Sequence, residues 1–469
     1  MQRLLYILTL ITVLGFTGCM LGPDFQKQQY SGPEKFRFDT TVAVKTVNLR
    51  WWELMNDTVL DTLIKIALEE NKDVLIAASR IESARANINY TKANQWPVFD
   101  YSAGANVGGT HESFTSGFSV YPGFSWEIGF WGKYRRLNEA ARAEYMASEY
   151  AKRTVQLSLI SAVATTYFYI LADYDQLSIA QSTLASRDSA LIIMRDKFEG
   201  GMISRIDYNQ AKIQRDIAAA TVPTYKRMIA LNENALSILL GRMPQSIVVG
   251  RPFYEHKYEL DIPSGVPSEL IKRRPDILQA EALYQAQNAQ IGVAEALRWP
   301  SFNLTGFMGA ASTDLLSLNA IGLTWSAGAN LFGPLFQFGQ NKRRVEIARQ
   351  NAYQSLVNYE KTVQQAFKDV EDALISISTY REEVAVQQSR AKTAIESETL
   401  SFIRYNEGST TYLEVLEQQR QSFASRLEVL SARLNLLKSY ILLYKALGGG
   451  WLSPEEEKAY LDSIQNSNK

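Results

Sequence analysis

Two stretches of the chain alternate apolar with polar or very small residues, and the pair Trp-Pro stands immediately before each. The first stretch covers about residues 98–130 and follows Trp96; the second covers about residues 301–332 and follows Trp299. A period of two is typical of β-strands with one apolar and one polar face. Each stretch therefore predicts a β-hairpin. Its aromatic residues near the strand ends favour a transmembrane barrel over a soluble sandwich.

Two positions disturb this alternation. Pro122 lies within the second predicted strand, where it cannot donate a ladder hydrogen bond, so that we expect a kink or bulge there. In the third predicted strand the alternation changes phase near Gly306, and a bulge is expected there as well.

Helical spacing replaces the alternation after each hairpin. Residues about 135–197 and about 343–405 contain no proline, and small and apolar residues recur in them every three or four positions. At a rise of 1.5 Å per residue, each would form a helix of roughly 90 Å. Such helices need partners over their whole length, which predicts coiled-coil packing. Turns that contain glycine follow, and return helices are expected over about 207–240 and about 413–447.

Helical spacing also precedes each hairpin. Residues 59–96 predict a helix that ends at the first Trp-Pro pair. A second helical segment leads to Trp299, and Pro275 within it has the residue type favoured at a helix start.

The order of these elements is written twice. Glycines at equivalent turns are separated by a single spacing of 207 residues (339 − 132, 408 − 201 and 448 − 241): Gly132 and Gly339, Gly201 and Gly408, Gly241 and Gly448. Markers in one order at one spacing indicate a tandem duplication of a unit of roughly two hundred residues. The predicted organisation is a signal peptide (1–18), a lipidated extended and equatorial segment (19–58), repeat 1 (59–244), a linker (245–267), repeat 2 (268–450) and an equatorial tail (451–469).

The amino terminus has the pattern of a signal peptide. Arg3 precedes an apolar run over residues 4–16, and the residues that follow are Thr17, Gly18 and Cys19. The run is too short to span a bilayer as a stable anchor. Small residues before a cysteine resemble a bacterial lipobox, which predicts that Cys19 carries the lipid anchor. An ordinary signal peptide that happens to contain a cysteine is the alternative, and no later apolar run predicts a transmembrane helix.

Composition and charge argue against catalysis and against nucleic acid as a partner. The formal net charge is zero, which is not the basic balance of a nucleic-acid-binding protein. The chain has one cysteine and two histidines, His111 and His256, which excludes a zinc cluster and an internal disulfide. We find no phosphate-binding loop and no metalloprotease motif. The sequence therefore predicts no catalytic residues, no cofactor and no metal site.

Four strands are too few to close a barrel, and the bilayer does not tolerate the unpaired edges of an open sheet. Three copies would supply twelve strands, an even number in the known range, so that the pattern predicts a homotrimer. The alternative is an elongated, lipid-anchored coiled-coil scaffold without a pore.

Several motifs resemble those of the TolC-like and OprM-like outer-membrane factors, in the lipoprotein (NodT-like) branch, over about residues 21–451. The motif with the highest specificity is KRRPDILQAEALYQAQNAQIGVAEALRWPSF at 272–302; WWELMNDTVLDTLIKIALEENKDVLIAASRIESARA at 51–86 and RYNEGSTTYLEVLEQQR at 404–420 also match. The resemblance implies a homotrimer with a twelve-strand outer-membrane barrel, a long α-helical periplasmic barrel and a small equatorial domain.

The resemblance also implies a function. Such proteins are passive exit ducts of tripartite efflux pumps in Gram-negative bacteria. Their partners are outer-membrane lipid, a periplasmic adaptor (membrane fusion) protein and an inner-membrane RND-type transporter. The cargo could be a drug, a metal or a secreted protein, and the lipobox favours the pump-linked branch over type I protein secretion.

The family's periplasmic gate can be carried over by position. Leu413 would form an apolar constriction and Glu417, in place of an expected aspartate, a ring of carboxylates. Arg404 and Arg420 would tether neighbouring helix pairs, with Tyr405 beside them. A surface ion pair between Glu417 and Arg420 is the simpler interpretation. The residues expected at the adaptor-docking tips are Gly200, Gly201, Ser204, Gly408, Ser409 and Thr411.

Overall fold

The computed structural model describes residues 20–28, 36–38, 52, 55–111, 113–256, 267–312 and 323–449. Cys19, the predicted signal peptide and the tail at 451–469 lie outside these residues. The contacts divide the chain into two units. Unit 1 contains residues 1–30, 78–150 and 278–362, and unit 2 contains residues 31–77, 151–277 and 363–469.

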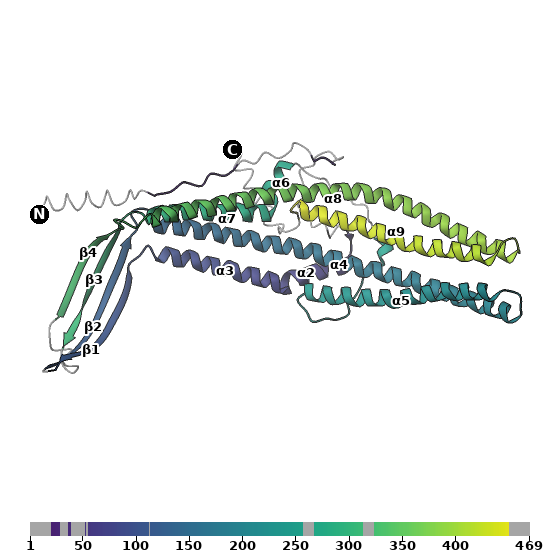
Figure 1. Cartoon of the computed structure of the whole chain (residues 1–469), viewed down its shortest axis with the longest axis horizontal. Coiled ribbons are helices and arrows are strands. Elements are labelled where there is room, and N and C mark those ends of the chain that lie inside the picture. Colours follow the sequence, from purple (N-terminus) through teal and green to yellow (C-terminus); the bar gives the residue numbers. More distant parts are fainter. Residues whose placement is uncertain are drawn as a thin grey trace. The chain divides into compact units, whose positions relative to one another are not determined.

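The strands of the described residues form one four-stranded antiparallel sheet, which lies in unit 1 (Figure 1). Its strands follow the chain order: β1 (Val98–Thr110), β2 (Ser113–Ile128), β3 (Ser301–Ser312) and β4 (Leu323–Phe332). The register keeps residues of like character opposite each other, as Phe99 with Phe124 and Phe302 with Leu331 do. One apolar face therefore continues across all four strands, as the alternation predicted.

Neither Pro122, where a kink or bulge was expected, nor Gly306 carries a bulge in the described strands. The β1–β2 ladder runs unbroken through Pro122, and the β2–β3 register is the same before and after it. Only the pairing of Tyr121 and Pro122 with β3 is missing. The β3–β4 ladder also keeps one register through Gly306. Here a Cβ atom would lie 2.5 Å from the ring of Phe124, so that glycine makes room for a cross-strand aromatic ring instead of marking a bulge.

The helical segment over residues 59–96 is two helices rather than one. Helix α2 (Thr58–Glu70) and helix α3 (Lys72–Ala93) meet at Asn71. The Asn71 carboxamide oxygen accepts from the backbone N–H of Asp73 (2.9 Å), which caps α3, and its Nδ2 donates to the Leu239 carbonyl (2.8 Å). The apolar periodicity continues through the break, which explains why the pattern alone missed it.

Repeat 2 has the same break. Helix α6 (Pro267–Arg273) and helix α7 (Pro275–Ala296) meet at Arg274. The Arg274 guanidinium donates to Asp276 (2.7 Å) and Asp369 (3.1 Å), and a Cβ on Gly448 would lie 3.0 Å from its Cα. Pro275 begins α7, the position that its residue type predicted.

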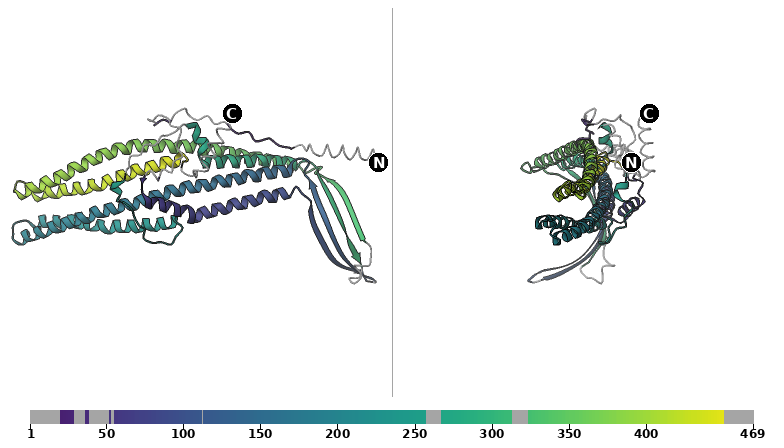
Figure 2. Two further views of the ribbon diagram at one scale, coloured as in Figure 1. Left: turned by 180° about the vertical axis from the view of Figure 1, so that it is seen from behind. Right: turned by 90° about the vertical axis from the view of Figure 1, so that its right-hand side faces the viewer.

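Four long helices dominate the fold. Helices α4 (Lys133–Glu199) and α8 (Gln340–Asn406) both contain 67 residues, and α5 (Arg205–Leu239) and α9 (Tyr412–Ala446) both contain 35. In unit 2, α5 lies beside α4 and α9 beside α8, as both views show (Figure 2). The identical lengths reflect the duplication at the level of whole elements.

The core of unit 2 holds aromatic and polar groups together. The Tyr167 hydroxyl of α4 donates to the Asp57 carboxylate (2.8 Å). Asp57 also caps α2. His256, just after the short 3₁₀ helix η2 (Phe253–Glu255), is 4% exposed, and its ring lies edge-on to Phe168. Burial lowers the pKa of His256, so that the ring is neutral, which fits a structural role.

Among the described residues, α4 contains one segment of a length and hydropathy that could cross a membrane. The apolar runs of the sequence predicted none after the signal peptide. Most of that segment is buried within the protein, as it would be in the core helix of a bundle.

Candidate functional site

The candidate site lies where each long helix of unit 2 reverses. Both turns place glycine in the left-handed region, with φ of +70° at Gly201 and +73° at Gly408. The next N–H groups close the turns: Met202 donates to the Lys197 carbonyl (2.8 Å) and Ser409 to the Arg404 carbonyl (2.9 Å). This hydrogen-bond pattern satisfies the last carbonyls of each helix and reverses the chain sharply.

The two return helices begin differently. Ser204 caps α5 and forms a reciprocal capping box with Asp207. Thr411 stands at the start of α9, but its side chain makes no cap hydrogen bond. Instead the Glu414 carboxylate accepts from Arg404 (2.6 Å) and from the Thr410 hydroxyl. In repeat 2 the start of α9 is therefore tied to the preceding helix by an ion pair across the turn rather than by a side-chain cap.

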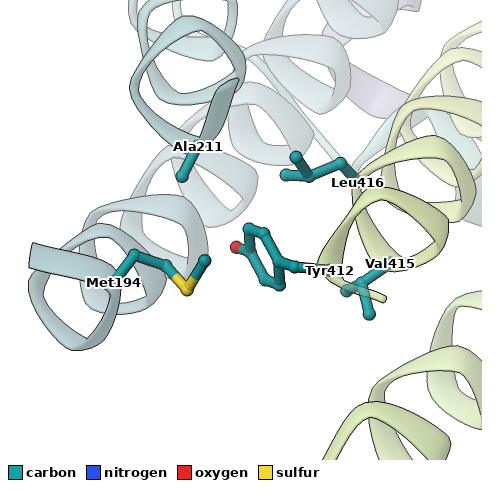
Figure 3. Packing of buried hydrophobic residues seen from close by; sticks show 5 residues of the cluster. All are labelled: Met194, Ala211, Tyr412, Val415 and Leu416. Atoms are coloured by element: carbon teal, nitrogen blue, oxygen red, sulfur yellow. The ribbon is translucent and has the colours of Figure 1, made fainter. Parts of the chain in front are cut away.

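A tip cluster of buried side chains joins the hairpins of the two repeats (Figure 3). Its members are Met194 of α4, Ala211 of α5, and Tyr412, Val415 and Leu416 of α9. In Figure 3 the Tyr412 ring points from α9 toward Met194. Burial raises the pKa of Tyr412 to about 12, so that the phenol stays neutral.

Tyr405 extends this connection to polar groups. The Lys197 ammonium donates to the Tyr405 hydroxyl (3.1 Å) and lies 4.7 Å from the centre of the Tyr405 ring. The Tyr405 and Tyr412 rings are 5.2 Å apart. Lys197 belongs to α4 and Tyr405 to α8, so that this contact links the ends of both long helices. Such a partly exposed contact is weak enough to be broken and re-formed.

Arg187 forms a third link between the hairpins. It is 4% exposed, its Nη1 donates to the Gln214 carbonyl of α5 (2.6 Å), and its guanidinium lies 5.2 Å from the Phe423 ring of α9. Burial lowers its pKa from the ordinary arginine value. A buried cation held by a carbonyl and a ring is a costly arrangement, which makes this contact sensitive to small displacements of the helices.

The remaining predicted gate residues lie on the exposed side of α9. Leu413 is 57% exposed and belongs to no buried cluster among the described residues. Glu417 accepts from Arg420 (2.8 Å) and Gln421 (3.0 Å), and the hydrogen bonds from Arg420 and then Gln421 lower the pKa of this exposed carboxyl. Within one chain the pair is therefore the surface ion pair of the simpler interpretation.

The positions predicted from the motif and the observed contacts agree only in part at this site. Arg404 and Arg420 make their ion pairs within the second hairpin, so that these pairs do not link the two hairpins within one chain. Tyr405 does reach it. Lys197 and Arg187 were missed, although Lys197 stands 207 positions before Arg404 and the repeat could have drawn attention to it (404 − 197). Their importance depends on which helix faces which, and the pattern of one helix does not contain that information.

The contacts at this site are those of two packed hairpins. Among the described residues, no group of three or more histidine, cysteine, aspartate or glutamate side chains could hold a metal ion. The tips offer apolar packing, ion pairs and contacts of aromatic rings with cations and with each other, which are the interactions of two hairpins that can separate and rejoin.

The chain matches a known family over most of its length. Residues 63–242 and 266–449 each match the profile described as outer membrane efflux protein, one segment for each repeat.

Relatives of known function match almost end to end. The cation efflux system protein CusC of Escherichia coli O6:H1 is 32% identical over 460 residues, which is 95% of this chain and 98% of that protein. The solvent efflux pump outer membrane protein SrpC of Pseudomonas putida is 33% identical over 466 residues, with coverage of 95% and 98%.

The fold matches as well. The open state of the Neisseria gonorrhoeae MtrE outer membrane channel has a TM-score of 0.84 at 30% identity, over 92% of this chain and 99% of that one. Two matched repeats, full-length relatives and a shared fold agree with the resemblance seen in the motifs. The chain belongs to the outer membrane efflux protein family.

Proposed function

We propose that three copies of this chain form the outer-membrane exit duct of a tripartite efflux pump. The duct conducts substrate passively from the periplasm to the exterior, after a periplasmic adaptor and an inner-membrane RND-type transporter have opened its periplasmic end. The strands form the part that crosses the membrane, and the long helices form the periplasmic stalk.

The single observation that carries this proposal is the sheet. Its apolar face is most exposed on the two edge strands: Phe99, Tyr101 and Val107 of β1, and Trp325 and Leu331 of β4, are between 71% and 84% exposed. Both edge strands, β1 and β4, have one strand neighbour each among the described residues. Exposed apolar surface is stable against lipid, and unpaired edges in lipid require closure by further strands. Strands from two more copies provide that closure.

The proposed lipid anchor is Cys19, and its neighbour Met20 supports this. Met20 lies against Gly132, at the end of the sheet and beside the Trp131–Trp299 ring pair (4.9 Å between centroids). Tryptophan is enriched at membrane interfaces. An anchor at Cys19 would thus leave the protein at the depth expected for the periplasmic leaflet.

The tips are proposed as the gate and the adaptor-docking surface. Leu413 and Glu417 are exposed, as a constriction facing a lumen requires. Arg404 and Arg420 would exchange their partners within the chain for partners on a neighbouring copy, while Tyr405 holds the two hairpins together. The adaptor would contact the turn residues, which are Gly200, Gly201, Ser204, Gly408, Ser409 and Thr411.

The gate is testable through the Lys197–Tyr405 contact. Lys197→Ala or Tyr405→Phe removes the hydrogen bond between the two long helices, and we expect more frequent opening in planar-bilayer recordings. Lys212→Ala, a change of the same kind on the exposed face of α5, is the matched control and should leave opening unchanged. Equal opening in all variants would contradict the role of this contact.

The names of the two relatives state cation efflux and solvent efflux, and these cargoes are properties of those relatives. We propose efflux for this chain without a cargo class, because the transporter selects what enters such a duct.

The proposal is tested with the full-length, detergent-purified protein. We expect a trimer by light scattering, an elongated stalk by negative-stain microscopy, and ion conductance in planar bilayers. A monomeric or dimeric rod that stays soluble without detergent would overturn the duct and favour the scaffold.

A further inference from the structure

The junction between sheet and long helix is built twice from the same parts. In repeat 1 it contains Gly132 (φ +78°) and the ion pair of Arg136 with Glu139 (2.8 Å). In repeat 2 it contains Gly339 (φ +83°) and the corresponding pair of Arg343 with Glu346 (2.5 Å). Each of these residues stands 207 positions after its counterpart (339 − 132, 343 − 136).

The repeat 1 junction is occupied by the chain itself, through residues 20–28, which we call the strap. Arg136 donates to the carbonyl oxygens of Leu21 and Gly22 (both 3.1 Å) and to the Asp24 carboxylate (2.9 Å). Arg136 is 1% exposed. The arginine of this junction, Arg136, therefore binds oxygen atoms, and one of them belongs to an anionic carboxylate.

The repeat 2 junction has the same backbone turn, and no segment of the chain that the structure describes covers it. A Cβ on Gly339 would meet nothing within 4 Å, whereas on Gly132 it would lie 2.8 Å from Met20. The Arg343 side chain is 72% exposed. Lys342 and Arg344, on either side of it, are exposed too, whereas Arg136 is buried. Repeat 1 has Leu137 at the position of Arg344 and Lys133 at the position of Gln340, so that each junction carries three cationic residues. In repeat 2 the three are consecutive and all exposed, whereas in repeat 1 Arg136 is buried.

Exposed apolar side chains directly precede this cationic group along the chain. Between the end of β4 and the start of α8, Leu335, Phe336 and Phe338 are 101%, 74% and 90% exposed, and the two phenylalanine rings are 4.6 Å apart. Phe338 also has a positive φ of 47°, an unfavourable conformation for an aromatic residue. Exposed aromatic and basic residues together are typical of a surface at the membrane interface.

We propose that this junction binds an anionic phospholipid of the periplasmic leaflet, one per chain. Lys342, Arg343 and Arg344 hold the phosphate where the repeat 1 junction holds the oxygens of the strap, and Leu335, Phe336 and Phe338 contact the acyl chains. The proposal rests on the proposed function, because the end of β4 must lie at the membrane. It assigns the strap and the lipid the same role, which is to cover one junction each.

A peptide strap from a second copy fits this junction less well. In repeat 1 the strap passes Gly292 of α7, where a Cβ would come within 2.6 Å of the Leu21 carbonyl. Ahead of the hairpins the two repeats are offset by 203 residues, as Trp96 and Trp299 are (299 − 96). Gly292 therefore corresponds to Asn89 of α3 (292 − 89), which has the side chain that this passage excludes. A small headgroup does not need that passage.

The test uses the detergent-purified full-length protein and measures binding of dioleoyl phosphatidylglycerol, with dioleoyl phosphatidylcholine as the neutral lipid, by native mass spectrometry across a concentration series. We expect saturable, salt-sensitive binding of the anionic lipid. The triple variant Lys342→Gln, Arg343→Gln, Arg344→Gln should bind it about 100-fold more weakly, since each basic residue near an anionic surface contributes roughly a factor of five.

A matched control removes three exposed charges from α5 (Lys212→Gln, Lys226→Gln, Arg227→Gln) and should bind like the unchanged protein. Inorganic phosphate at the same concentration should not displace the lipid, because it lacks acyl chains. Equal binding of both lipids, or full binding by the triple variant of the junction, would overturn the proposal. The assay counts the lipid bound to whichever oligomer is present. Trimers that conduct ions but bind no anionic lipid would overturn the lipid site alone. A protein that forms no conducting trimers would overturn the duct.

Discussion

Single glycines decide how the repeats close. Gly241 and Gly448, at equivalent positions after the return helices, have φ of +73° and +69°. The backbone of Glu70 passes so close to Gly241 that a Cβ would lie 2.2 Å from the Glu70 carbonyl oxygen. Gly201 has a similar φ of +70° but open space around it. Substitution at Gly201 therefore measures the loss of stability from backbone conformation alone, and substitution at Gly241 adds the loss from a close contact.

We expect Gly201→Ala to cost about 1 kcal/mol, the ordinary penalty of a left-handed alanine. Gly241→Ala must add a backbone displacement and should cost about 3 kcal/mol or more. Thermal unfolding followed by circular dichroism would measure both. Equal shifts of the midpoint would mean that the contact with Glu70 is not tight.

A buried carboxyl group, that of Asp173, should make the stability of the protein depend on pH. Asp173 of α4 is 4% exposed and accepts from Asn232 of α5 (2.8 Å). Burial raises the pKa of Asp173 to about 6 from 3.8, although the Asn232 hydrogen bond lowers it. The folded-state pKa lies above the unfolded value, so that folding favours the protonated carboxyl. The contribution of Asp173 to stability is fully present below about pH 4 and is lost as the pH rises through about 6.

Asp173→Asn should therefore stabilise the protein at pH 8, by on the order of 2 kcal/mol, and change little at pH 4. Thermal midpoints at both pH values would measure this. Asp196→Asn, at an exposed aspartate, is the control and should show no such dependence. An effect of Asp173→Asn of the same size at both pH values would contradict the raised pKa.

At the scale of elements, the duplication produces equal helices that differ in their ends. α4 and α8 have the same length, but α4 begins under the strap and α8 begins in the open. The strap also reaches α7, where Asn288 donates to the Pro23 carbonyl (3.2 Å) and Glu281 pairs with Lys27 (2.9 Å). It thus joins the first helix turn of one repeat to the helix that opens the other.

Arg136→Gln should release the strap, because its carbonyl and carboxylate ligands lose a buried cation. We expect faster tryptic cleavage after Lys27. The free energy of unfolding should fall by about 3 kcal/mol, which lowers the thermal midpoint. Arg343→Gln is the matched control, since the same residue in repeat 2 is exposed and should change neither quantity. Cleavage at the unchanged rate in Arg136→Gln would show that the strap is held by other contacts.

At the scale of the whole molecule, the two faces of the sheet should meet different surroundings. Ala329 and Asn330 are neighbours on β4 and point to opposite faces, Ala329 opposite Leu304 and Asn330 opposite Asn303. Ala329→Arg places a charge on the lipid face and should cost roughly 2–4 kcal/mol of membrane stability, while Asn330→Arg faces the lumen and should be tolerated.

Heat-modifiable migration and the yield of trimer in outer-membrane fractions would measure this pair. We expect Ala329→Arg to lower the trimer yield and Asn330→Arg to leave it unchanged. The reverse result would mean that the polar face meets lipid, and equal results would argue against a membrane barrel.

The sequence by itself determined the elements and their repetition. Periods of two and of three to four residues are local properties, and they predicted the hairpins and the long helices. One spacing of 207 residues, which needs no knowledge of contacts, revealed the duplication. The same local reasoning failed at Asn71, where the periodicity continues through a helix break, and at Gly306, where glycine accommodates a ring instead of a bulge.

Only the tertiary structure decided which residues meet. The contacts of Lys197 with Tyr405, of Met194 with Tyr412 and of Arg136 with the strap join residues more than a hundred positions apart. A helix pattern states which face is apolar but not which neighbour covers it. For that reason two arginines of one repeated motif, Arg136 and Arg343, differ completely in burial, and the sequence could not distinguish the covered junction from the open one.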